Sequence, residues 1–302
     1  MKMAYGSDKL EKVIGFIGLG AMGKPMAENF LKAGYELNVF DVSALVMEKW
    51  KKTSANLCKN VTEVAEESDI IFSSLPNGKI VQSIMEGEEG VLASCKTGSV
   101  IVDLSSVAPE TSENLCQKAG EKGVCYLDSP VSGGVTGAQK GTLTLMVGGD
   151  REAYEAVLPE LNCIGKNIFY IGKSGSGDAM KIVNNLLLGC NMAALAEALI
   201  LGEKCGLDLK TMKEIISISS GRSYVSEAKL ENFIMPESYE GGFAISLQHK
   251  DLSLALEAGK AVTMPLPMTS MAAQIYELAK AEGLSRKDIS ALVKMWSEHT
   301  LK

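Results

Sequence analysis

The chain has 302 residues, of which 46% are hydrophobic, and its formal net charge is −7. This length supports two domains or one large one, and the apolar content is sufficient for a packed core. Because the sequence contains no basic block, the charge argues against nucleic-acid binding and against anionic membrane surfaces, although it is compatible with a small anionic substrate in a cleft.

The rarer residue types indicate a cellular compartment and argue against a metal site. Seven cysteines lie at irregular spacings without a CxxC pair, a pattern typical of reduced thiols in the cytoplasm. The two histidines, His249 and His299, stand fifty residues apart, so we expect no zinc site. The first residues, MKMAYGSDKLEK, lack the apolar core of a signal peptide. We therefore expect a cytoplasmic protein.

From Val13 the chain shows a nucleotide-binding pattern. A strand from Val13 is followed by a glycine-rich turn, a helix over 24–33 that ends at Gly34, and a second strand over 35–40 closed by Asp41. This order is typical of the dinucleotide-binding unit of a doubly wound sheet. The turn residues predicted to contact the cofactor are Gly18, Leu19, Gly20, Met22 and Gly23.

Each glycine has a physical role in such a turn. Gly18 permits the tight bend, Gly20 lets the backbone approach the pyrophosphate, and Gly23 lets the helix pack against the strand. The N–H groups and positive dipole end of the helix attract the phosphates. Asp41 is expected to accept the ribose hydroxyls and to repel a 2′-phosphate, which favours NAD over NADP. The alternative is an ordinary strand–helix turn, which does not explain the position of the acid.

Strands and helices continue to alternate up to Gly172. We expect strands over 69–75, 99–104, 124–127, 142–147 and 167–171, and helices over 44–52, 61–67, 79–85, 109–122 and 152–161. Ligands of a doubly wound sheet bind beyond the carboxyl ends of its strands. Leu75, Pro76, Asn77 and Ser106 follow two such strands, which places them in the predicted cleft, although turn chemistry explains these residue types equally well.

The segment after the strand over 124–127, DSPVSGGVTGA, is rich in glycine and hydroxyl side chains. Backbone N–H groups beside a hydroxyl form a small anion pocket. The segment is therefore a candidate anion site, and the alternative is a mobile loop.

Residues 175–206 are almost wholly apolar and contain no proline, which predicts one long buried helix. Ser176 or Asp178 is expected to cap its start, and Gly206 its end. Lys181 and Asn185 are four residues apart and so lie on one face of the helix.

The polar residues of this helix have competing explanations. A buried lysine is costly, and an ion pair or a snorkelling side chain explains Lys181 as well as chemistry does. A membrane span is disfavoured because three asparagines and Glu197 interrupt the apolar run.

Beyond Gly206 the pattern is helical. We expect helices over 208–218, 225–233, 247–262, 268–282 and 286–299, which form an all-α second domain. The domain boundaries are 12–173 and 174–302. Arg222 lies in a helix–helix turn and Lys250 at a helix start, and both also fit ordinary surface positions.

Four segments together resemble the β-hydroxyacid dehydrogenases: GFIGLGAMGKPMA, DSPVSGGVTGAQKGTLTLMVGG, GSGDAMKIVNN and HKDLSLALEAG. The resemblance extends over nearly the whole chain from Val13. It implies a Rossmann domain and an all-α domain of the 6-phosphogluconate dehydrogenase type, joined by the long helix. Members commonly form dimers or tetramers, so we expect a homo-oligomer.

The resemblance also implies residue roles. Lys181 corresponds to the catalytic lysine, Ser132, Gly133 and Gly134 bind the substrate carboxylate, and Asn185 lies beside the lysine. Lys250 is implied to reach the cofactor or the substrate. The implied contacts on the nicotinamide side are Leu75, Pro76 and Ser106. Ser106 replaces a threonine of many members and keeps the hydroxyl.

The expected reaction is reversible hydride transfer between NAD and the alcohol carbon of a β-hydroxyacid, with Lys181 as acid and base. A free lysine titrates near about 10.4, and burial together with the charge of Lys250 is expected to lower the pKa of Lys181. Three further segments, KIVNNLLLGCNMA, SSGRSY and GGFAISLQHKDL, are most similar to members that interconvert 2-formylglutarate and 2-(hydroxymethyl)glutarate. Arg222 is the candidate partner of the second carboxylate.

Other functions stay open at this point. Within the family they are the 3-hydroxyisobutyrate, tartronate semialdehyde and succinic semialdehyde reactions. An imine reductase of the same architecture usually lacks the lysine. A module that binds NAD without turnover has no need of Lys181, Asn185 and Ser132 together.

Overall fold

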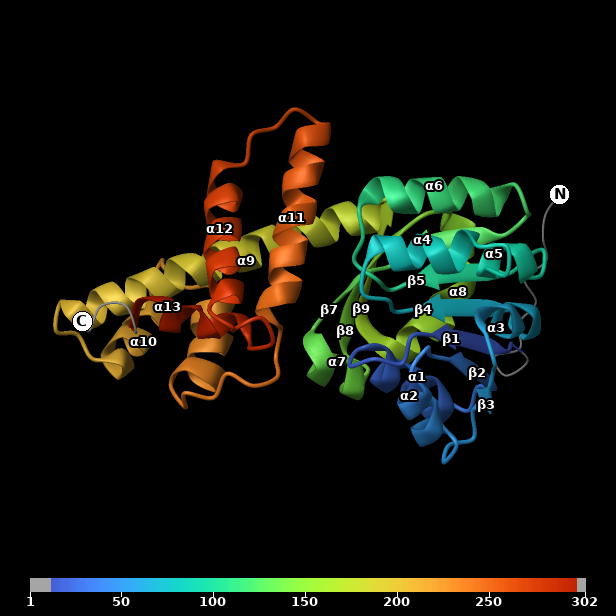
Figure 1. Cartoon of the computed structure of the whole chain (residues 1–302), viewed down its shortest axis with the longest axis horizontal. Coiled ribbons are helices and arrows are strands. Elements are labelled where there is room, and N and C mark those ends of the chain that lie inside the picture. The colour runs from blue at the N-terminus through green and yellow to red at the C-terminus, as the bar shows by residue number, and fades with distance from the viewer. Residues whose placement is uncertain (1–11, 298–302) are drawn as a thin grey trace. The chain divides into compact units, whose positions relative to one another are not determined.

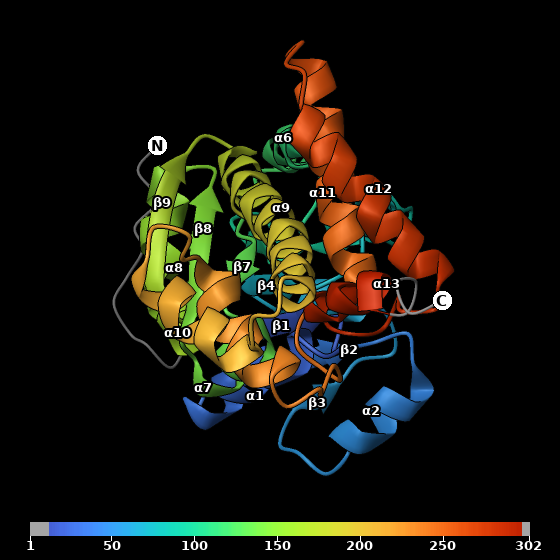
Figure 2. The same ribbon diagram turned by 90° about the vertical axis from the view of Figure 1, so that its left-hand side faces the viewer.

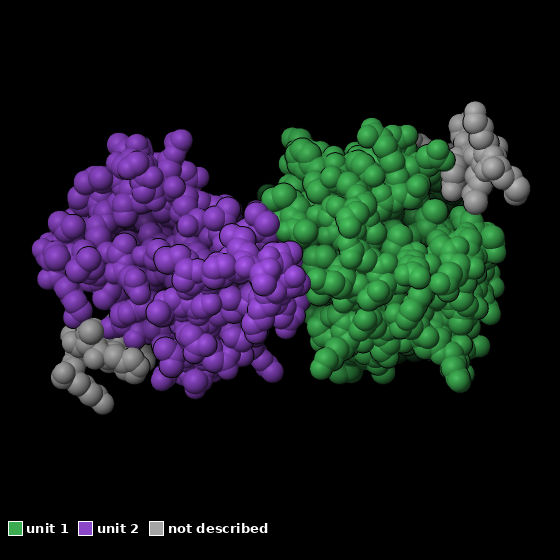
Figure 3. Space-filling view, turned by 90° about the horizontal axis from the view of Figure 1, so that it is seen from above, with its two compact units in different colours: residues 1–181 green, residues 182–302 purple. Residues whose placement is uncertain are grey.

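A computed structural model describes residues 12–297 (Figure 1). All but the last residue of the first segment, MKMAYGSDKLEK, and His299 lie outside the described residues. The chain forms two compact units, residues 1–181 and residues 182–302 (Figure 3). The division falls inside the long helix α9 (Ser176–Lys204), directly after Lys181.

The first unit is built on a nine-stranded sheet in the order β3-β2-β1-β4-β5-β6-β8-β7, with β9 paired to β8. All pairs from β3 to β6 are parallel, whereas β8 runs antiparallel to β6 and β7. The carboxyl ends of the parallel strands therefore meet at one edge of the sheet, as the predicted cleft requires. The strands are β1 (Ile14–Ile17), β2 (Leu37–Phe40), β3 (Asn56–Leu57), β4 (Ile70–Ser73), β5 (Val100–Asp103), β6 (Cys125–Asp128), β7 (Val131–Ser132), β8 (Leu143–Gly148) and β9 (Gly165–Gly172).

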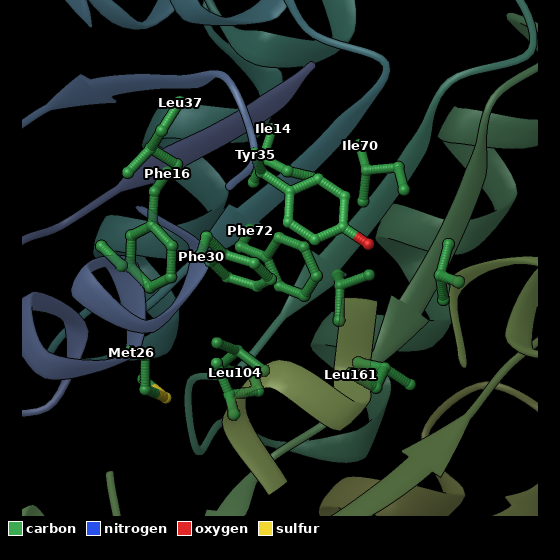
Figure 4. Close-up of a cluster of buried hydrophobic side chains, with 14 of the residues drawn as sticks. Ile14, Phe16, Met26, Phe30, Tyr35, Leu37, Ile70, Phe72, Leu104 and Leu161 are labelled. Atoms are coloured by element: carbon green, nitrogen blue, oxygen red, sulfur yellow. The ribbon is translucent and has the colours of Figure 1, made fainter. Parts of the chain in front are cut away.

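Helices cover both faces of this sheet and bury two apolar clusters. The cluster under α1 and α8 contains packed aromatic rings, with Phe72 4.7 Å from Phe30 and 6.2 Å from Phe16 between ring centroids (Figure 4). The other cluster lies under α3 to α6. The helices are α1 (Gly23–Lys32), α2 (Ala44–Trp50), α3 (Val61–Glu67), α4 (Gly78–Glu86), α5 (Val91–Ser94), α6 (Pro109–Gly120), α7 (Gly134–Lys140) and α8 (Arg151–Ile164). This arrangement confirms the predicted doubly wound fold.

The second unit is helical over its described residues, apart from a single bridge between Ala244 and Asp288. Its core gathers around the later turns of α9, and α11 and α12 lie side by side (Figure 2). Its other elements are α10 (Leu209–Ile218), a π-helix η1 (Val225–Ile234), α11 (Ile245–Ala261), α12 (Pro267–Ala281), a 3₁₀ helix η2 (Ile289–Val293) and α13 (Lys294–Ser297).

Two helices of this unit differ from the expectation. The segment over 225–233 forms a π-helix rather than an α-helix. The prediction of a single helix over 286–299 is wrong at its start, because Asp288 is extended and η2 begins only at Ile289. The Asp288 carboxylate caps η2 by accepting from the N–H of Ser290 at 3.0 Å. It also accepts from Lys229 at 2.6 Å, a distant partner that local periodicity does not reveal.

This buried ion pair leads to a stability prediction. The side chains of Lys229 and Asp288 are 6% and 0% exposed, so Lys229→Met leaves a carboxylate buried without its cation. We expect a loss of about 3–5 kcal/mol in the free energy of unfolding. The control is Lys213→Met, which removes a pair with Glu231 whose side chains are 25% and 60% exposed and is expected to cost at most about 1 kcal/mol. Chemical denaturation monitored by circular dichroism measures both, and equal losses would refute the assignment.

Candidate functional site

The glycine turn after β1 is shaped by two close backbone contacts. Gly18 has φ +91°, and a Cβ there would lie 2.4 Å from the carbonyl oxygen of Ser74. A Cβ on Gly23 would lie 1.9 Å from the carbonyl oxygen of Gly18. Both positions therefore require glycine for the fold itself. The roles predicted for Gly18 and Gly23, a tight bend and close packing, agree with this geometry.

Gly20 differs from these two glycines because the protein gives no steric reason for it. No heavy atom lies within 4 Å of a Cβ built there, and the residue is exposed. Met22 stands at the N-cap of α1 without capping it through its side chain, and the first turn of α1 contains no acidic residue. An open glycine beside an uncapped helix start fits a bound phosphate group. This turn is therefore suited to a dinucleotide pyrophosphate.

Asp41 follows β2 and is tied to the glycine turn. Its Oδ2 accepts a hydrogen bond from the N–H of Leu19 at 2.7 Å, and its Oδ1 accepts from the N–H of Ser43 at 2.8 Å. The structure thus brings Asp41 into contact with the glycine turn, although α1 lies between them in the sequence. A carboxylate has about four lone-pair sites, so Asp41 retains acceptors for ribose hydroxyls.

The segment after β4 is held by a buried hydroxyl network. The N–H of Leu75 donates to Ser105 Oγ at 2.9 Å, and this hydroxyl donates to Asp103 Oδ1 at 2.6 Å. Ser73 and Tyr126 also donate to Asp103, at 2.7 and 3.2 Å. Burial raises the pKa of Asp103, while these donors oppose the rise. Asp103 therefore fixes a loop of the predicted cleft, a role that we did not predict.

The other residues of the predicted cleft differ in their contacts and in their exposure. The side chain of Leu75 adjoins the glycine turn, because a Cβ on Gly18 would lie only 3.1 Å from it. Asn77 caps α4, because its Oδ1 accepts from the N–H of Ile80 at 3.0 Å, which gives it a structural role as well. Pro76 is exposed and Ser106 is half-buried.

The predicted carboxylate-binding segment is ordered secondary structure. Ser132 ends β7 and pairs with Thr144 of the antiparallel neighbour β8. Gly133 and Gly134 follow with φ +128° and +63°, and α7 begins at Gly134. Positive φ at both glycines turns the backbone sharply, so the chain leaves the direction of β7 directly after Ser132. Ser132 is half-buried, and the two glycines are exposed.

The start of α9 corrects one expectation. Asp178 does not cap the helix, because its carboxylate accepts instead from Ser112 Oγ at 2.7 Å and from the N–H of Val107 at 3.3 Å. The cap is Asp128 at the end of β6, which accepts from several N–H groups of the first turn. Lys181 follows within one turn and is 9% exposed.

Asn185, further along α9, belongs to a polar cluster within the second unit. Its Nδ2 donates to Asp251 Oδ2 at 2.5 Å, and its Oδ1 accepts from Asn184 at 2.9 Å. Lys250 lies 3.4 Å from the other Asp251 oxygen, and Gln248 donates to the backbone oxygen of Asn185 at 2.8 Å. The structure therefore links Asn185 to Lys250 through Asp251, which we did not predict as a site residue.

Arg222 is not part of this cluster. It is exposed and lies between α10 and η1, where its N–H donates to the backbone oxygen of Ser219 at 3.2 Å. Sequence position could have drawn attention to the two acids that the prediction missed. Asp128 ends a strand just before the glycine-rich segment, and Asp251 directly follows Lys250.

Among residues 12–297 no group of three or more histidine, cysteine, aspartate or glutamate side chains is placed to hold a metal ion. One helix, α9, is long and apolar enough to cross a membrane by length and composition. Its buried residues Met192, Ala196 and Leu199 belong to the core of the second unit, which is the behaviour of a core helix in a globular protein.

Comparison with known proteins agrees with both units. Residues 13–172 match the NAD binding domain of 6-phosphogluconate dehydrogenase. Residues 175–296 match the family described as NAD-binding of NADP-dependent 3-hydroxyisobutyrate dehydrogenase.

Individual relatives match along almost their entire length. The chain is 57% identical to 2-(hydroxymethyl)glutarate dehydrogenase of Eubacterium barkeri, over 95% of each chain. It is 39% identical to NAD-dependent L-serine dehydrogenase of Pseudomonas aeruginosa, over 94% of this chain and 98% of the relative. The structure of Mycobacterium tuberculosis 3-hydroxyisobutyrate dehydrogenase with L-serine superposes with a TM-score of 0.88 at 30% identity, over 94% of this chain and 98% of the other. These matches confirm the resemblance, and the chain belongs to the 3-hydroxyisobutyrate dehydrogenase-like β-hydroxyacid dehydrogenases, which are NAD(P)-dependent oxidoreductases.

Proposed function

We propose that this protein reversibly reduces 2-formylglutarate to 2-(hydroxymethyl)glutarate with NADH. The observation that carries the proposal is the 57% identity, over 95% of each chain, to an enzyme named for that product. The site supports the chemistry because the open glycine turn suits a dinucleotide and a buried lysine stands one helical turn beyond a fixed helix start.

In this proposal Lys181 controls the proton of the reaction. The nicotinamide supplies the hydride chemistry when it is bound. As an ammonium, Lys181 stabilises the charge that develops on the substrate carbonyl oxygen and donates a proton to it. In the oxidative direction the neutral amine accepts the proton of the alcohol. Because Lys181 is 9% exposed, water competes little for this oxygen, and the interaction is stronger than at the protein surface.

Asn185 is proposed to orient the substrate hydroxyl. Its amide oxygen accepts from Asn184 and one of its N–H bonds points to Asp251, so the second N–H is left to donate to the substrate oxygen. This orientation is fixed by the carboxylate of Asp251, which is 4% exposed. Lys250, beside the same carboxylate, is proposed to contact the cofactor or the substrate.

The substrate carboxylate is proposed to bind at Ser132, Gly133 and Gly134. The hydroxyl of Ser132 and the backbone N–H groups of the two glycines are suitable donors to an anion. For the cofactor, the carboxylate side chain of Asp41 after β2 favours NAD, because it would repel a 2′-phosphate there.

The proposed function is tested by NADH consumption across three- to six-carbon semialdehydes, repeated with NADPH. We expect 2-formylglutarate to give the highest kcat/KM, and NADH to be preferred. A higher value with methylmalonate, tartronate or succinic semialdehyde would reassign the substrate within the family. No oxidation of NADH with any semialdehyde would reject the function.

The second carboxylate of the substrate gives a prediction for Arg222. A charge-assisted pair with this exposed arginine is worth up to about 1 kcal/mol, so Arg222→Ala is expected to raise KM for dicarboxylates about two- to fivefold. KM for monocarboxylate semialdehydes is expected to change little. Arg151→Ala, an exposed arginine of the first unit that pairs with Glu155, is the control. Equal effects of Arg222→Ala on both substrate classes would remove Arg222 from the site.

We also propose a cytoplasmic homo-oligomer. The second unit exposes large apolar side chains that a monomer would leave in water, among them Ile218, Val262, Met264, Met268 and Met271. Analytical ultracentrifugation at micromolar concentration measures the state, and a monomer there would contradict the proposal.

A further inference from the structure

The first turn of α9 is fixed by a carboxylate from a distant part of the chain. Asp128 Oδ1 accepts from the N–H of Gly175 at 2.8 Å. Its Oδ2 accepts from the N–H groups of Gly177 and Asp178 at 2.8 and 3.1 Å. The hydroxyl of Ser174 adds a longer bond of 3.4 Å. Asp128 therefore satisfies the N–H groups of Gly177 and Asp178, two of the four donors that the start of α9 leaves without an intrahelical partner.

The space around this carboxylate is closed. A Cβ on Gly148 would lie 2.7 Å from Asp128 Oδ2, and a Cβ on Gly177 would lie 2.8 Å from the same atom and 2.2 Å from the carbonyl oxygen of Met146. Asp128 itself is 1% exposed. Burial raises the pKa of Asp128, and the backbone N–H donors oppose that rise. The second glycine of the GSGD sequence is thus explained by the approach of the helix to Asp128.

A second carboxylate anchors the same turn. Asp178 accepts from Ser112 Oγ on α6 at 2.7 Å and from the N–H of Val107 at 3.3 Å. Val107 directly follows Ser106, and Lys181 lies three residues after Asp178. Side chains three residues apart lie on neighbouring positions of a helix face. The anchors therefore act on the turn from which Lys181 projects.

We infer that Asp128 is a positioning residue of the reaction, which holds the turn bearing Lys181 and the segment leading to Ser132 in one fixed geometry. Asp128 ends β6, and the chain passes from it to Ser132 within four residues. Any shift of Asp128 therefore displaces both proposed groups together. The inference rests on the proposed role of Lys181.

The test uses Asp128→Asn in the full-length protein. The amide keeps the size of the side chain but turns an N–H₂ group toward backbone N–H donors, so the first turn of α9 must move. Misplacement by about 1 Å costs roughly 10²-fold in rate. We expect kcat to fall about 10- to 100-fold, while the dissociation constant of NADH, measured by fluorescence quenching, stays within about twofold because the glycine turn is not altered.

A matched control separates positioning from a general loss of stability. Asp150 caps α8 in the same unit, where its Oδ1 accepts from the N–H of Ala153 at 2.8 Å, and α8 contains no proposed site residue. Asp150→Ala is expected to lower the melting temperature as a lost cap does and to leave kcat unchanged. If both variants lower kcat equally, the positioning role is rejected.

A double-mutant cycle shows whether Asp128 acts through Lys181. In the background of Lys181→Met, Asp128→Asn is expected to change the residual kcat by less than about twofold, because groups that act as a unit are not additive. A full further loss would overturn the inference. If Lys181→Met alone leaves turnover intact, the proposed function fails instead, and hydrogen exchange over residues 175–181 then reports whether Asp128 still fixes the turn.

A milder variant keeps the test decisive if Asp128→Asn does not fold. Ser112→Ala removes the 2.7 Å bond to Asp178 without touching Asp128. It is expected to lower kcat about three- to tenfold in the wild-type background, consistent with one lost hydrogen bond, and to have no effect in the Lys181→Met background. Unchanged kcat in the wild-type background would contradict the anchoring of this turn.

Discussion

Replacing Lys181 with methionine is expected to lower kcat by about 10²–10⁴-fold, the usual contribution of a general acid–base. Methionine has a similar length and no charge, so the 9% exposed position remains filled and α9 keeps its packing. Without the ammonium, the developing charge on the substrate oxygen loses its stabilising partner and its proton donor. The measurement is the steady-state rate in both directions at saturating cofactor.

The binding of NADH to Lys181→Met should remain close to that of the wild type, because the glycine turn is unchanged. Lys204→Met, at the exposed far end of the same helix, is the control and should retain full activity. Turnover of Lys181→Met within about tenfold of wild type would show that another group handles the proton.

Asp41→Asn is expected to raise the ratio of kcat/KM for NADPH over NADH by about 10- to 100-fold. The change removes the negative charge that opposes a 2′-phosphate, and it weakens the charge-assisted hydrogen bonds to the ribose, each worth about 1.5–3 kcal/mol. Asparagine suits the test because one oxygen remains to accept from the N–H of Leu19, which Asp41 binds at 2.7 Å. Initial rates with both cofactors at fixed substrate give the ratio.

Asp69→Asn is the control for Asp41→Asn. Asp69 also binds a backbone N–H beside β1, because its Oδ2 accepts from Val13 at 2.9 Å, but it lies at the amino ends of the strands, away from the glycine turn. The ratio should be unchanged in this variant. An unchanged ratio in Asp41→Asn as well would show that residues outside the turn select the cofactor.

Local signals were sufficient for most of the fold. Gly206 ends the long helix with φ +83° as expected, and Asp208 caps α10 by accepting from the N–H of Thr211 at 2.9 Å. These features depend on residues within a few positions of one another, which propensity and turn chemistry describe. The glycine turn and the alternating strands were predictable for the same reason.

Non-local partners explain what the sequence could not reveal. The cap of α9 comes from Asp128, 47 residues before Gly175, so the nearby Asp178 was the wrong expectation. The carboxylate that orients Asn185 is Asp251, 66 residues away. In both cases the sequence contained a suitable acid, but only the folded chain shows which backbone or amide group it meets.

The helical continuity of α9 has a consequence for how such an enzyme can be altered. Lys181 and Asn185 share one unbroken helix, so each inserted or deleted residue between them would turn every later side chain by about 100° around the axis. The helix therefore fixes the angle between the Lys181 and Asn185 side chains. An insertion or deletion between them should abolish turnover rather than change the substrate preference. Engineering of new substrate preference is therefore better directed at turns such as the one bearing Arg222, where chain length can vary without rotating the helix.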